Sequence, residues 1–259
     1  MGTETPAVPI FRLDGKVAMV TGAGRGLGAE IALALAAQGA DIVVADRTLA
    51  ETEATAAAVT ALGRRALPAE ADLLSVPAIR DMVAKAAGEL GRIDILVNNA
   101  GVNITQFAED VTEQAWDTVL GVNLKAVFFC SQAAGKVMIG QKGGKIVNVS
   151  SQAGAVAIPK RAAYCSSKGA VNQLTRLLAL EWAKHNIHVN AVAPTFLETP
   201  LTKPMFEDGE FRKYVLDSIP LGRIGKPSDV TGAVVFLASP ASDMVTGHVL
   251  HVDGGWTIR

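Results

Sequence analysis

The sequence lacks most features that mark a secreted, metal-binding or membrane-spanning protein. It contains two cysteines in 259 residues, too few for a disulfide framework or a zinc site. Its four histidines do not form the H-E-x-x-H arrangement, and no metal is expected. No basic patch precedes an apolar stretch near the N-terminus, so a secretory signal is not expected either. A reducing, cytoplasmic compartment is the prediction.

An excess of one charge and long apolar runs are also missing. There are 24 basic and 25 acidic residues, which argues against binding to nucleic acid or to an anionic membrane surface. Apolar runs such as residues 31–37 are far shorter than the roughly 18 residues of a bilayer span. Hydrophobic residues nevertheless make up 49% of the chain, which is too apolar for a disordered protein. The chain must therefore bury a large core.

Short β-branched runs alternate along the chain with alanine-rich and leucine-rich segments of helical length. Several of the runs are apolar on both faces, as in a parallel sheet that helices cover on both sides. The predicted strands are residues 16–21, 41–46, 66–70, 93–98, 145–150, 187–193 and 248–252. The predicted helices are residues 26–38, 49–62, 76–89, 112–139, 161–184 and 227–238. The pattern predicts an α/β Rossmann fold with a doubly wound, parallel seven-stranded sheet and helices on both faces.

No linker, repeat or low-complexity tract divides the chain, and a single domain over residues 1–259 is expected. Residues 195–225 differ from the rest because they form a long, irregular stretch of mixed polarity without a strand. Such an insertion in an α/β enzyme is usually a lid or a substrate loop. We expect it to cover the substrate.

A glycine-rich turn, TGAGRGLG, follows the first predicted strand and opens the first helix at residues 21–28. Glycines let the backbone approach a pyrophosphate, whose charge meets the positive end of the helix. A purely structural turn also favours glycine, but the position in a βαβ unit favours a dinucleotide site. The expected cofactor contacts are Gly22, Arg25, Gly26, Leu27 and Gly28.

The second predicted strand ends at Asp46, close to the roughly 20-residue offset at which an acid binds an adenosine ribose. Because this carboxylate repels a 2′-phosphate, NAD is favoured as the cofactor. NADP stays possible because Arg25 and Arg47 could bind the phosphate, although Arg47 could equally be a solvated charge. After the third strand, Asp72 either caps a turn or accepts a hydrogen bond from adenine, with Leu73 as a further cofactor contact.

Tyr164 and Lys168 are four residues apart in a predicted helix, which places them on one helix face within about 6 Å. This spacing alone is common. Ser151 follows the fifth strand, residues 98–101 (NNAG) follow the fourth, and Asn123 lies in the helix between them. All would meet at the carboxyl ends of parallel strands, where open α/β sheets bind ligands.

Together these motifs resemble the short-chain dehydrogenase/reductase family. TGAGRGLG matches its T-G-x-x-x-G-x-G, NNAG its fourth-strand motif, and Ser151 with Tyr164-x-x-x-Lys168 its active site. The resemblance runs from about Leu13 to Gly255. It implies that Tyr164 is the acid/base, that Lys168 binds the nicotinamide ribose and lowers the tyrosine pKa, that Ser151 holds the substrate oxygen, and that Asn123 belongs to a proton relay.

The resemblance also implies cofactor contacts after the fourth and sixth strands. They are Asn99, Ala100, Gly101, Pro194 and Thr199. One departure is Thr195, which stands where the family commonly has glycine after the proline. A residue with a Cβ accepts fewer backbone conformations than glycine, but we expect catalysis to be retained.

The chemistry of alcohol oxidation independently requires these residue types. The substrate loses a hydride and a hydroxyl proton, and a phenol with an ordinary pKa near 10 is mostly protonated at neutral pH. A neighbouring ammonium and the cationic nicotinamide both favour the phenolate, while Ser151 can donate to the developing oxygen charge. A serine hydrolase is rejected because no G-x-S-x-G turn is present.

Polar residues are expected around the reacting carbon, which favours a polar substrate over a steroid or a long acyl chain, although several of them could be rim residues. They are Asn103, Ser151, Gln152, Arg161 and Glu198. The segments PLTKPMFEDGEF, IPLGRIGKP and ASDMVTGHVLHVDGGW resemble gluconate 5-dehydrogenase and related sugar-acid or polyol dehydrogenases of the family. The predicted substrate is a small secondary alcohol or ketone of this kind.

Two other functions are possible on the same fold. A 3-oxoacyl-carrier-protein reductase would use NADPH, and Asp46 argues against it. A non-catalytic nucleotide sensor is the other alternative, since fold does not determine function, but sensors usually lose the pair that Tyr164 and Lys168 form here.

The predicted helices at 112–139 and 161–184 carry more apolar side chains than one sheet face can cover. A monomer would then expose patches of several hundred Å². We therefore predict a homotetramer with two-fold axes. The alternative is that both helices pack deeper into the core. The apolar residues are Trp116, Val119, Leu120, Val127, Phe128, Phe129, Leu174, Leu177, Leu178, Leu180 and Trp182.

Overall fold

A seven-stranded parallel sheet forms the centre of the protein, in the order β3-β2-β1-β4-β5-β6-β7. The computed structural model describes residues 11–200 and 202–258. The strands are β1 (Val17–Thr21), β2 (Asp41–Asp46), β3 (Ala66–Glu70), β4 (Ile95–Asn98), β5 (Gly144–Val149), β6 (Ile187–Pro194) and β7 (Val249–Val252). The predicted doubly wound sheet is confirmed.

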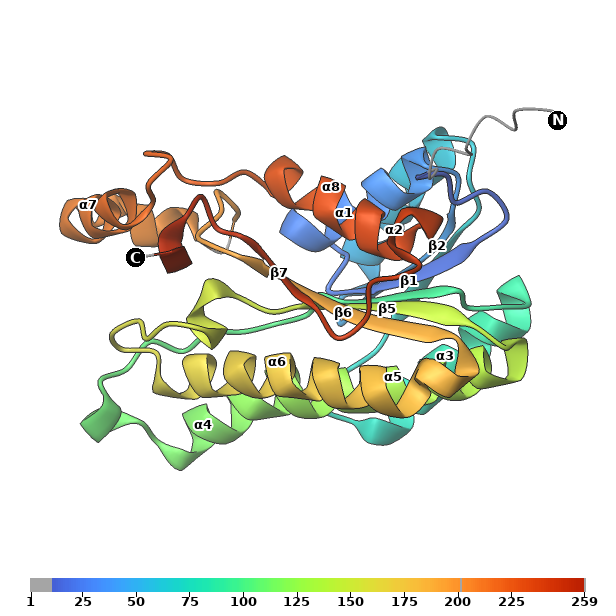
Figure 1. Cartoon of the computed structure of the whole chain (residues 1–259), viewed down its shortest axis with the longest axis horizontal. Helices are drawn as coiled ribbons and strands as arrows, with labels where there is room; N and C mark the ends of the chain where they lie inside the picture. The colour runs from blue at the N-terminus through green and yellow to red at the C-terminus, as the bar shows by residue number, and fades with distance from the viewer. Residues whose placement is uncertain (1–10, 201, 259) are drawn as a thin grey trace, which may run out of the picture.

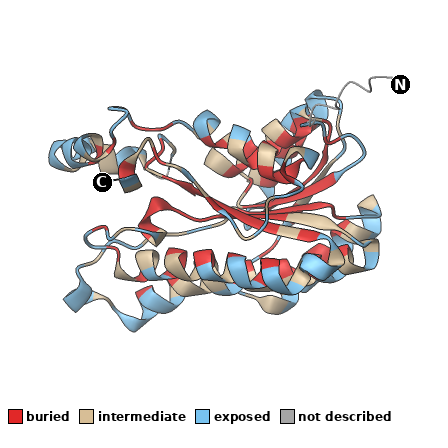
Figure 2. Cartoon of the chain, in the orientation of Figure 1, coloured by how far each residue is buried: buried red, intermediate tan, exposed pale blue. Residues whose placement is uncertain are grey.

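Helices cover both faces of this sheet (Figure 1). One layer contains α1 (Gly26–Ala37), α2 (Leu49–Ala61) and α8 (Pro227–Ala238). The other contains α3 (Val76–Leu90), α4 (Glu113–Leu120), α5 (Ala126–Gln141) and α6 (Ala162–Trp182). Figure 2 shows that burial is concentrated in the strands and on the helix faces turned toward them. None of the helices within the described residues has the length and hydropathy needed to cross a bilayer.

Neighbouring residues of one strand contribute to two different apolar cores. Val20 packs with Ile31 of α1 and Val234 of α8, whereas Met19 packs with Ile79 and the helices of the opposite layer. Side chains alternate across a strand, so a strand between two helical layers must be apolar at every position. Each large aliphatic side chain buried in this way contributes roughly 1.5–3 kcal/mol to folding.

The strand order reverses next to β1, which pairs with β2 on one side and with β4 on the other. The chain leaves β3 at one edge of the sheet and returns to the centre as β4. The connections that leave β1 and β4 therefore diverge at the carboxyl ends of these strands. Such a switch point is where open α/β sheets bind ligands.

Two segments differ from the predicted elements. The helix predicted at 112–139 is divided, because a π-helical turn at Gly121–Lys125 separates α4 from α5. The stretch 195–225 is less irregular than expected, since it contains a 3-10 turn at Lys203–Glu207 and the helix α7 (Gly209–Ser218). Asp208 caps α7 by accepting from the amides of Glu210 and Phe211. Leu201, within this stretch, lies outside the described residues.

Candidate active site

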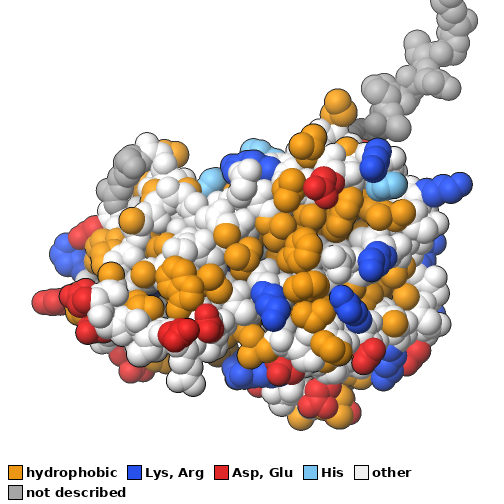
Figure 3. Space-filling view, turned by 90° about the horizontal axis from the view of Figure 1, so that it is seen from below, with side chains coloured by type: hydrophobic (Ala, Val, Ile, Leu, Met, Phe, Trp, Pro, Cys, Tyr) orange, Lys and Arg blue, Asp and Glu red, His pale blue; other side chains and the backbone are white. Residues whose placement is uncertain are grey.

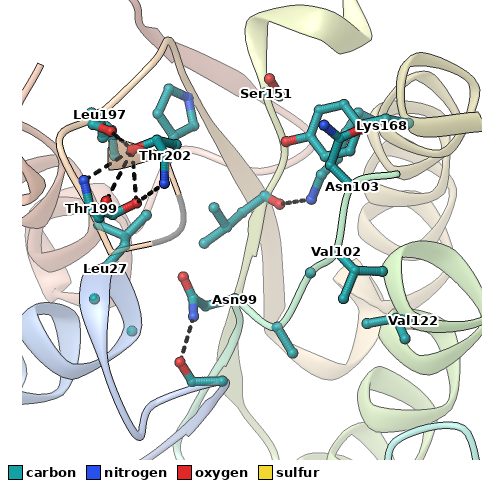
Figure 4. A pocket seen from close by; sticks show the side chains of 18 of the residues that line it. Leu27, Asn99, Val102, Asn103, Val122, Ser151, Lys168, Leu197, Thr199 and Thr202 are labelled. Carbon is teal, nitrogen blue, oxygen red and sulfur yellow. Dashed lines mark hydrogen bonds between the residues drawn. The ribbon is translucent and has the colours of Figure 1, made fainter. Parts of the chain in front are cut away.

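A cavity of about 500 Å³ lies at the carboxyl ends of the strands. The glycine-rich turn, the ends of β2 and β4, the start of α6 and the chain that follows β6 all line it. In Figure 4, Leu197, Thr199 and Thr202 lie on one side of the cleft, opposite Ser151 and Lys168. Thr202 Oγ1 donates to the Leu197 carbonyl, which holds the first side together.

The glycine-rich turn brings main chain against main chain. Gly22 has a φ of 64°, in the left-handed region that glycine adopts without steric cost. A Cβ at Gly28 would stand 2.0 Å from the Gly22 carbonyl oxygen and 2.5 Å from Asn99 Nδ2. The same Nδ2 donates to the carbonyls of Thr21 and Gly22, at 3.0 Å each. This turn at the start of α1 brings glycine backbone to the cavity wall, with Arg25 and Leu27 beside it, and it fits a pyrophosphate.

Asp46 is fixed at the edge of the same cavity. Its carboxylate accepts from the Gly24 amide at 3.0 Å and from the Arg47 amide at 2.7 Å. Arg25 forms an ion pair with Glu51 at 3.2 Å, while the Arg47 side chain is exposed. One carboxylate and two guanidinium groups therefore line the end of the cavity at which an adenosine ribose would lie.

Asp72 and Leu73, after β3, also line the cavity. An Asp72 carboxylate oxygen accepts from the Leu74 amide at 2.9 Å. This bond is the one expected of a turn residue, and it leaves the second oxygen available for a ligand.

Ser151, Tyr164 and Lys168 come together in the cavity. Lys168 Nζ lies 5.7 Å from the centroid of the Tyr164 ring and donates to the Val149 carbonyl at 2.8 Å. Ser151 Oγ donates to Gln152 Oε1 at 2.8 Å. The i, i+4 spacing thus places tyrosine and lysine on one face of α6, as predicted.

The surroundings of the tyrosine and the lysine shift both pKa values. Burial raises the pKa of Tyr164, against the opposing effects of a hydrogen bond with Ser151 and of the charge on Arg161. Burial lowers the pKa of Lys168 to about 8. At neutral pH the phenol is therefore protonated and the lysine is mostly charged. Forming the phenolate requires further positive charge beside the ring.

Asn123 lies behind the cavity rather than in its wall. It occupies the π-helical turn and is fully buried. Its Oδ1 accepts from the Val102 amide at 2.8 Å, and its Nδ2 donates to the Val102 carbonyl at 2.9 Å and to Ser167 Oγ at 3.1 Å. Through these bonds Asn123 fixes the position of the loop after β4. Such π-turns often occur at functional sites.

The residues predicted to surround the substrate divide into two groups. Asn103, Ser151, Gln152 and Arg161 line the cavity. Glu198 does not line it, and the prediction is corrected for this residue, whose side chain is exposed. The Glu198 amide donates to the Gly225 carbonyl at 2.8 Å. This bond holds the backbone of Glu198, while the residues on either side of it, Leu197 and Thr199, line the cavity.

Thr195 and Met205 line the cavity but were not among the predicted substrate contacts. Thr195 has a buried hydroxyl with no partner in the described residues, and its φ is not positive. Its position at the carboxyl end of β6 could have indicated a contact. Met205 lies 3.7 Å (Sδ) from Arg161 Nη2, and no motif in the sequence indicates that approach.

This chain is similar to known proteins over nearly its whole length. The family described as enoyl-(acyl carrier protein) reductase matches residues 22–257. 2-Dehydro-3-deoxy-D-gluconate 5-dehydrogenase of Escherichia coli (strain K12) is 48% identical over 253 residues, which cover 96% of this chain and 98% of the relative. The chain belongs to the short-chain dehydrogenase/reductase family.

This short-chain dehydrogenase/reductase is also 44% identical over 252 residues to D-threitol dehydrogenase of Mycolicibacterium smegmatis, covering 96% of this chain and 95% of the relative. Its fold matches the crystal structure of a gluconate 5-dehydrogenase from Burkholderia cenocepacia J2315 in complex with NADP and tartrate. That match has a TM-score of 0.93 and 38% identity, and it covers 96% of this chain and 98% of the other.

These matches confirm the predicted family, fold and enzyme class. The protein is an NAD(P)-dependent oxidoreductase that acts on CH–OH groups. Two relatives are named as dehydrogenases of a sugar acid and of a polyol. Membership in a family described by an enoyl reductase therefore does not carry that reaction over to this chain.

Proposed function

We propose that this enzyme oxidises one secondary hydroxyl of a sugar, a sugar acid or a polyol to a ketone, with NAD as the oxidant. The observation that carries the proposal is the meeting of Ser151, Tyr164 and Lys168 in a cavity continuous with the glycine-rich turn. Relatives named for such substrates support it. The nicotinamide, as the hydride acceptor, and Tyr164, as the proton acceptor, would thus lie beside the same carbinol group of the substrate.

Each side chain of this group has a proposed role. The bound nicotinamide would take the hydride from the carbinol carbon. Tyr164 accepts the hydroxyl proton and later releases it to solvent, so that the alcohol yields a ketone, reduced cofactor and a proton. Ser151 donates to the substrate oxygen. Lys168 binds the nicotinamide ribose, and its charge with that of the oxidised ring favours the phenolate.

The cofactor would lie along the wall that begins at the glycine-rich turn, where close packing against Gly22 and Asn99 leaves no room for a Cβ at Gly28. Asn123 is proposed as a positioning residue for this wall, since it holds Val102. The residues proposed to hold the cofactor are Gly22, Arg25, Gly26, Leu27, Gly28, Asp46, Arg47, Asp72, Leu73, Asn99, Ala100, Gly101, Tyr164, Lys168, Pro194 and Thr199.

NAD is proposed over NADP because, of the three charges at this end of the cavity, Asp46 is fixed and Arg25 is paired, which leaves the exposed Arg47 alone to attract a 2′-phosphate. The Asp46 carboxylate is held by two amides and would repel a 2′-phosphate. Arg25 is paired with Glu51 and is less available to bind that phosphate. The similar structure from B. cenocepacia contains NADP, and kinetics with both nucleotides test the preference proposed for this chain.

Residues 195–225 are proposed as the lid over the substrate. Thr195, Leu197 and Met205 of this segment line the cavity. Phe211 of α7 packs edge-on against Phe196, with 5.5 Å between the ring centroids. The helix thus supports the part of the lid that faces the substrate.

An absorbance assay of reduced nicotinamide tests the proposal directly. The purified protein is given NAD or NADP with polyols, sugar acids, cyclic alcohols and β-ketoesters. We expect turnover of a sugar acid or polyol with NAD. Turnover restricted to β-ketoacyl thioesters with NADPH would favour a 3-oxoacyl-carrier-protein reductase, and cofactor binding without any turnover would favour a sensor.

We further propose a homotetramer with two-fold axes. Trp116, Leu177 and Leu180 are 37%, 47% and 79% exposed on α4 and α6, and Figure 3 shows apolar side chains gathered on this side of the molecule. Other predicted interface residues, Val119 and Leu178, are buried within the chain itself. Light scattering at micromolar concentration should return four chain masses, and the mass of one chain would contradict the proposal.

A reducing cytoplasmic location is proposed from the cysteines. Cys130 and Cys165 are both free thiols, and burial raises the pKa of Cys130 to about 12. Cell fractionation of the native host should place the enzyme with the cytosolic proteins.

A further inference from the structure

Arg161 carries a buried positive charge with no acidic partner in the described part of the chain. The residue is 6% exposed and lines the cavity together with Ser151 and Tyr164. Burial lowers its pKa. Its neighbours are the Met205 sulfur at 3.7 Å and the rings of Phe196 and Phe211, whose centroids lie 5.5 and 5.4 Å from Cζ. These groups contact the guanidinium but bring no negative charge to it.

Several other arginines of this protein do have acidic partners. Arg64 and Arg65 both bind Asp41, at 2.7 Å, and Arg92 binds Asp94 at 2.6 Å. Charged side chains are rarely buried unless they are paired. A guanidinium also has five donors arranged as a fork, which a thioether and two aromatic rings leave largely unused.

The backbone holds Arg161 in this position. Lys160, directly before it, has a φ of 62°, a backbone conformation that residues other than glycine rarely adopt. The Gln106 amide donates to the Lys160 carbonyl at 3.0 Å, and Gln106 and Arg161 form a β-bridge. Because Arg161 lies one helical turn before Tyr164, its charge reaches the catalytic phenol.

We propose that Arg161 binds a carboxylate of the substrate, so that the enzyme acts on sugar acids in preference to neutral polyols. The inference rests on the proposed dehydrogenase function and adds a substrate class to it. A carboxylate matches the guanidinium fork with two parallel hydrogen bonds. A neutral polyol would leave the buried charge unpaired and would therefore bind less well.

A structural role for Arg161 makes a different prediction. If the guanidinium only held the lid by contact with Phe196 and Phe211, its removal would loosen the lid over every substrate. Acids and polyols would then lose turnover equally. The comparison of a charged substrate with its neutral counterpart separates the two roles.

The experiment compares Arg161→Gln with Lys160→Gln, which removes an exposed positive charge from the adjacent position. Substrates are D-gluconate and D-glucitol with NAD, together with D-galactonate and 2-dehydro-3-deoxy-D-gluconate as further acids. We expect Arg161→Gln to lower kcat/KM for the accepted acid about 10²-fold, mainly through KM, the size of a lost charge-assisted hydrogen-bond pair. D-Glucitol should change less than about threefold, and Lys160→Gln should leave both substrates unchanged.

A second variant, Arg161→Lys, and a binding measurement distinguish the loss of a carboxylate site from misfolding of Arg161→Gln. The lysine variant keeps the charge and should restore part of the acid preference. Isothermal titration of the same acids into the NADH complex should show at least tenfold weaker binding in Arg161→Gln. Equal losses on acid and polyol, or wild-type enzyme that neither binds nor oxidises any acid, would overturn the proposal.

Two further outcomes separate this inference from the proposed function. Acid binding that depends on Arg161 without any turnover would contradict the dehydrogenase function and leave the carboxylate site standing. Polyol turnover that exceeds acid turnover and is unchanged in Arg161→Gln would contradict the carboxylate site and leave the dehydrogenase function standing. A preference for D-glucitol 6-phosphate over D-gluconate would show that Arg161 binds a phosphate, and it would overturn the assignment of a carboxylate site.

Discussion

The two ends of the cavity differ in how their polar groups are satisfied. At the glycine-rich end, Asp46, Arg25 and Asn99 already have partners within the protein. At the catalytic end, Asn103 Oδ1 and Thr195 Oγ1 are buried without a partner in the described residues, and Arg161 has no acid beside it. Buried polar groups without partners are costly. One end is therefore preformed for its ligand, while the other obtains its partners from the substrate.

The largest expected effect concerns the catalytic end. Tyr164→Phe keeps the ring but removes the proton that is transferred, so kcat should fall by at least about 10²-fold. NAD binding should persist, because the preformed end is unchanged. Steady-state rates and an equilibrium titration with NADH measure the two quantities separately. Near-normal turnover of this variant would sink the assignment of the acid/base.

The next effect concerns the glycine-rich end. Gly28→Ala places a Cβ 2.0 Å from the Gly22 carbonyl oxygen, so the main chain must shift. We expect a loss of roughly 1–3 kcal/mol in the free energy of unfolding, as for other overpacked sites, together with weaker NAD binding. Urea denaturation and NADH titration test both.

Gly88→Ala is the matched control for that substitution. Gly88 lies in α3 with nothing within 4 Å of an added Cβ. Alanine in a helix interior is favoured over glycine by roughly 0.5–1 kcal/mol. The control should therefore be slightly stabilising, with unchanged NAD affinity. If both variants were equally stable, close backbone packing at Gly28 would not explain its identity.

A smaller effect is expected for cofactor choice. Asp46→Ser removes the carboxylate that opposes a 2′-phosphate, so the ratio of kcat/KM for NADP over NAD should rise about tenfold, which corresponds to about 1.4 kcal/mol. Glu51→Gln removes the ion pair of Arg25. It should also raise the ratio of kcat/KM for NADP over NAD, by a smaller factor. Wild-type preference for NADP would show that Arg25 and Arg47 outweigh Asp46.

A separate effect is a pH dependence of stability that comes from Lys168. Burial lowers its pKa from 10.5 to about 8. In that range the unfolded chain binds more protons than the folded chain, so this contribution to stability rises with pH. The unfolding free energy of wild type relative to Lys168→Met should increase between about pH 8 and 10. A constant difference would show that the lysine is not desolvated.

The comparison between the two ends also explains how much the sequence alone could predict. Gly22 and Asp46 are identifiable because a short motif and a strand end place them without reference to distant residues. Arg161 was identifiable as a candidate, but its approach to Met205 was not. That contact depends on how residues 195–225 pack, and α7 within this stretch was not predicted because the segment is short and of mixed polarity.

Two other residues show where pattern reasoning fails. Asn123 was predicted in an ordinary helix, yet it lies in a π-helical turn, which no periodicity in the sequence indicates. Glu198 was predicted beside the substrate because it follows a strand. The direction of its side chain depends on how the irregular chain after β6 packs, which the sequence pattern does not indicate.

The strand order also has a consequence for how the chain folds during synthesis. β2 pairs with β1 on one side and with β3 on the other, and all three strands lie before residue 71. The other partner of β1, the strand β4, ends at Asn98, and α6 begins only at Ala162. Because synthesis proceeds from the N-terminus, the emerging chain lacks the second partner of β1 until β4 arrives. We expect this open edge of β1 to be the segment that chaperones protect.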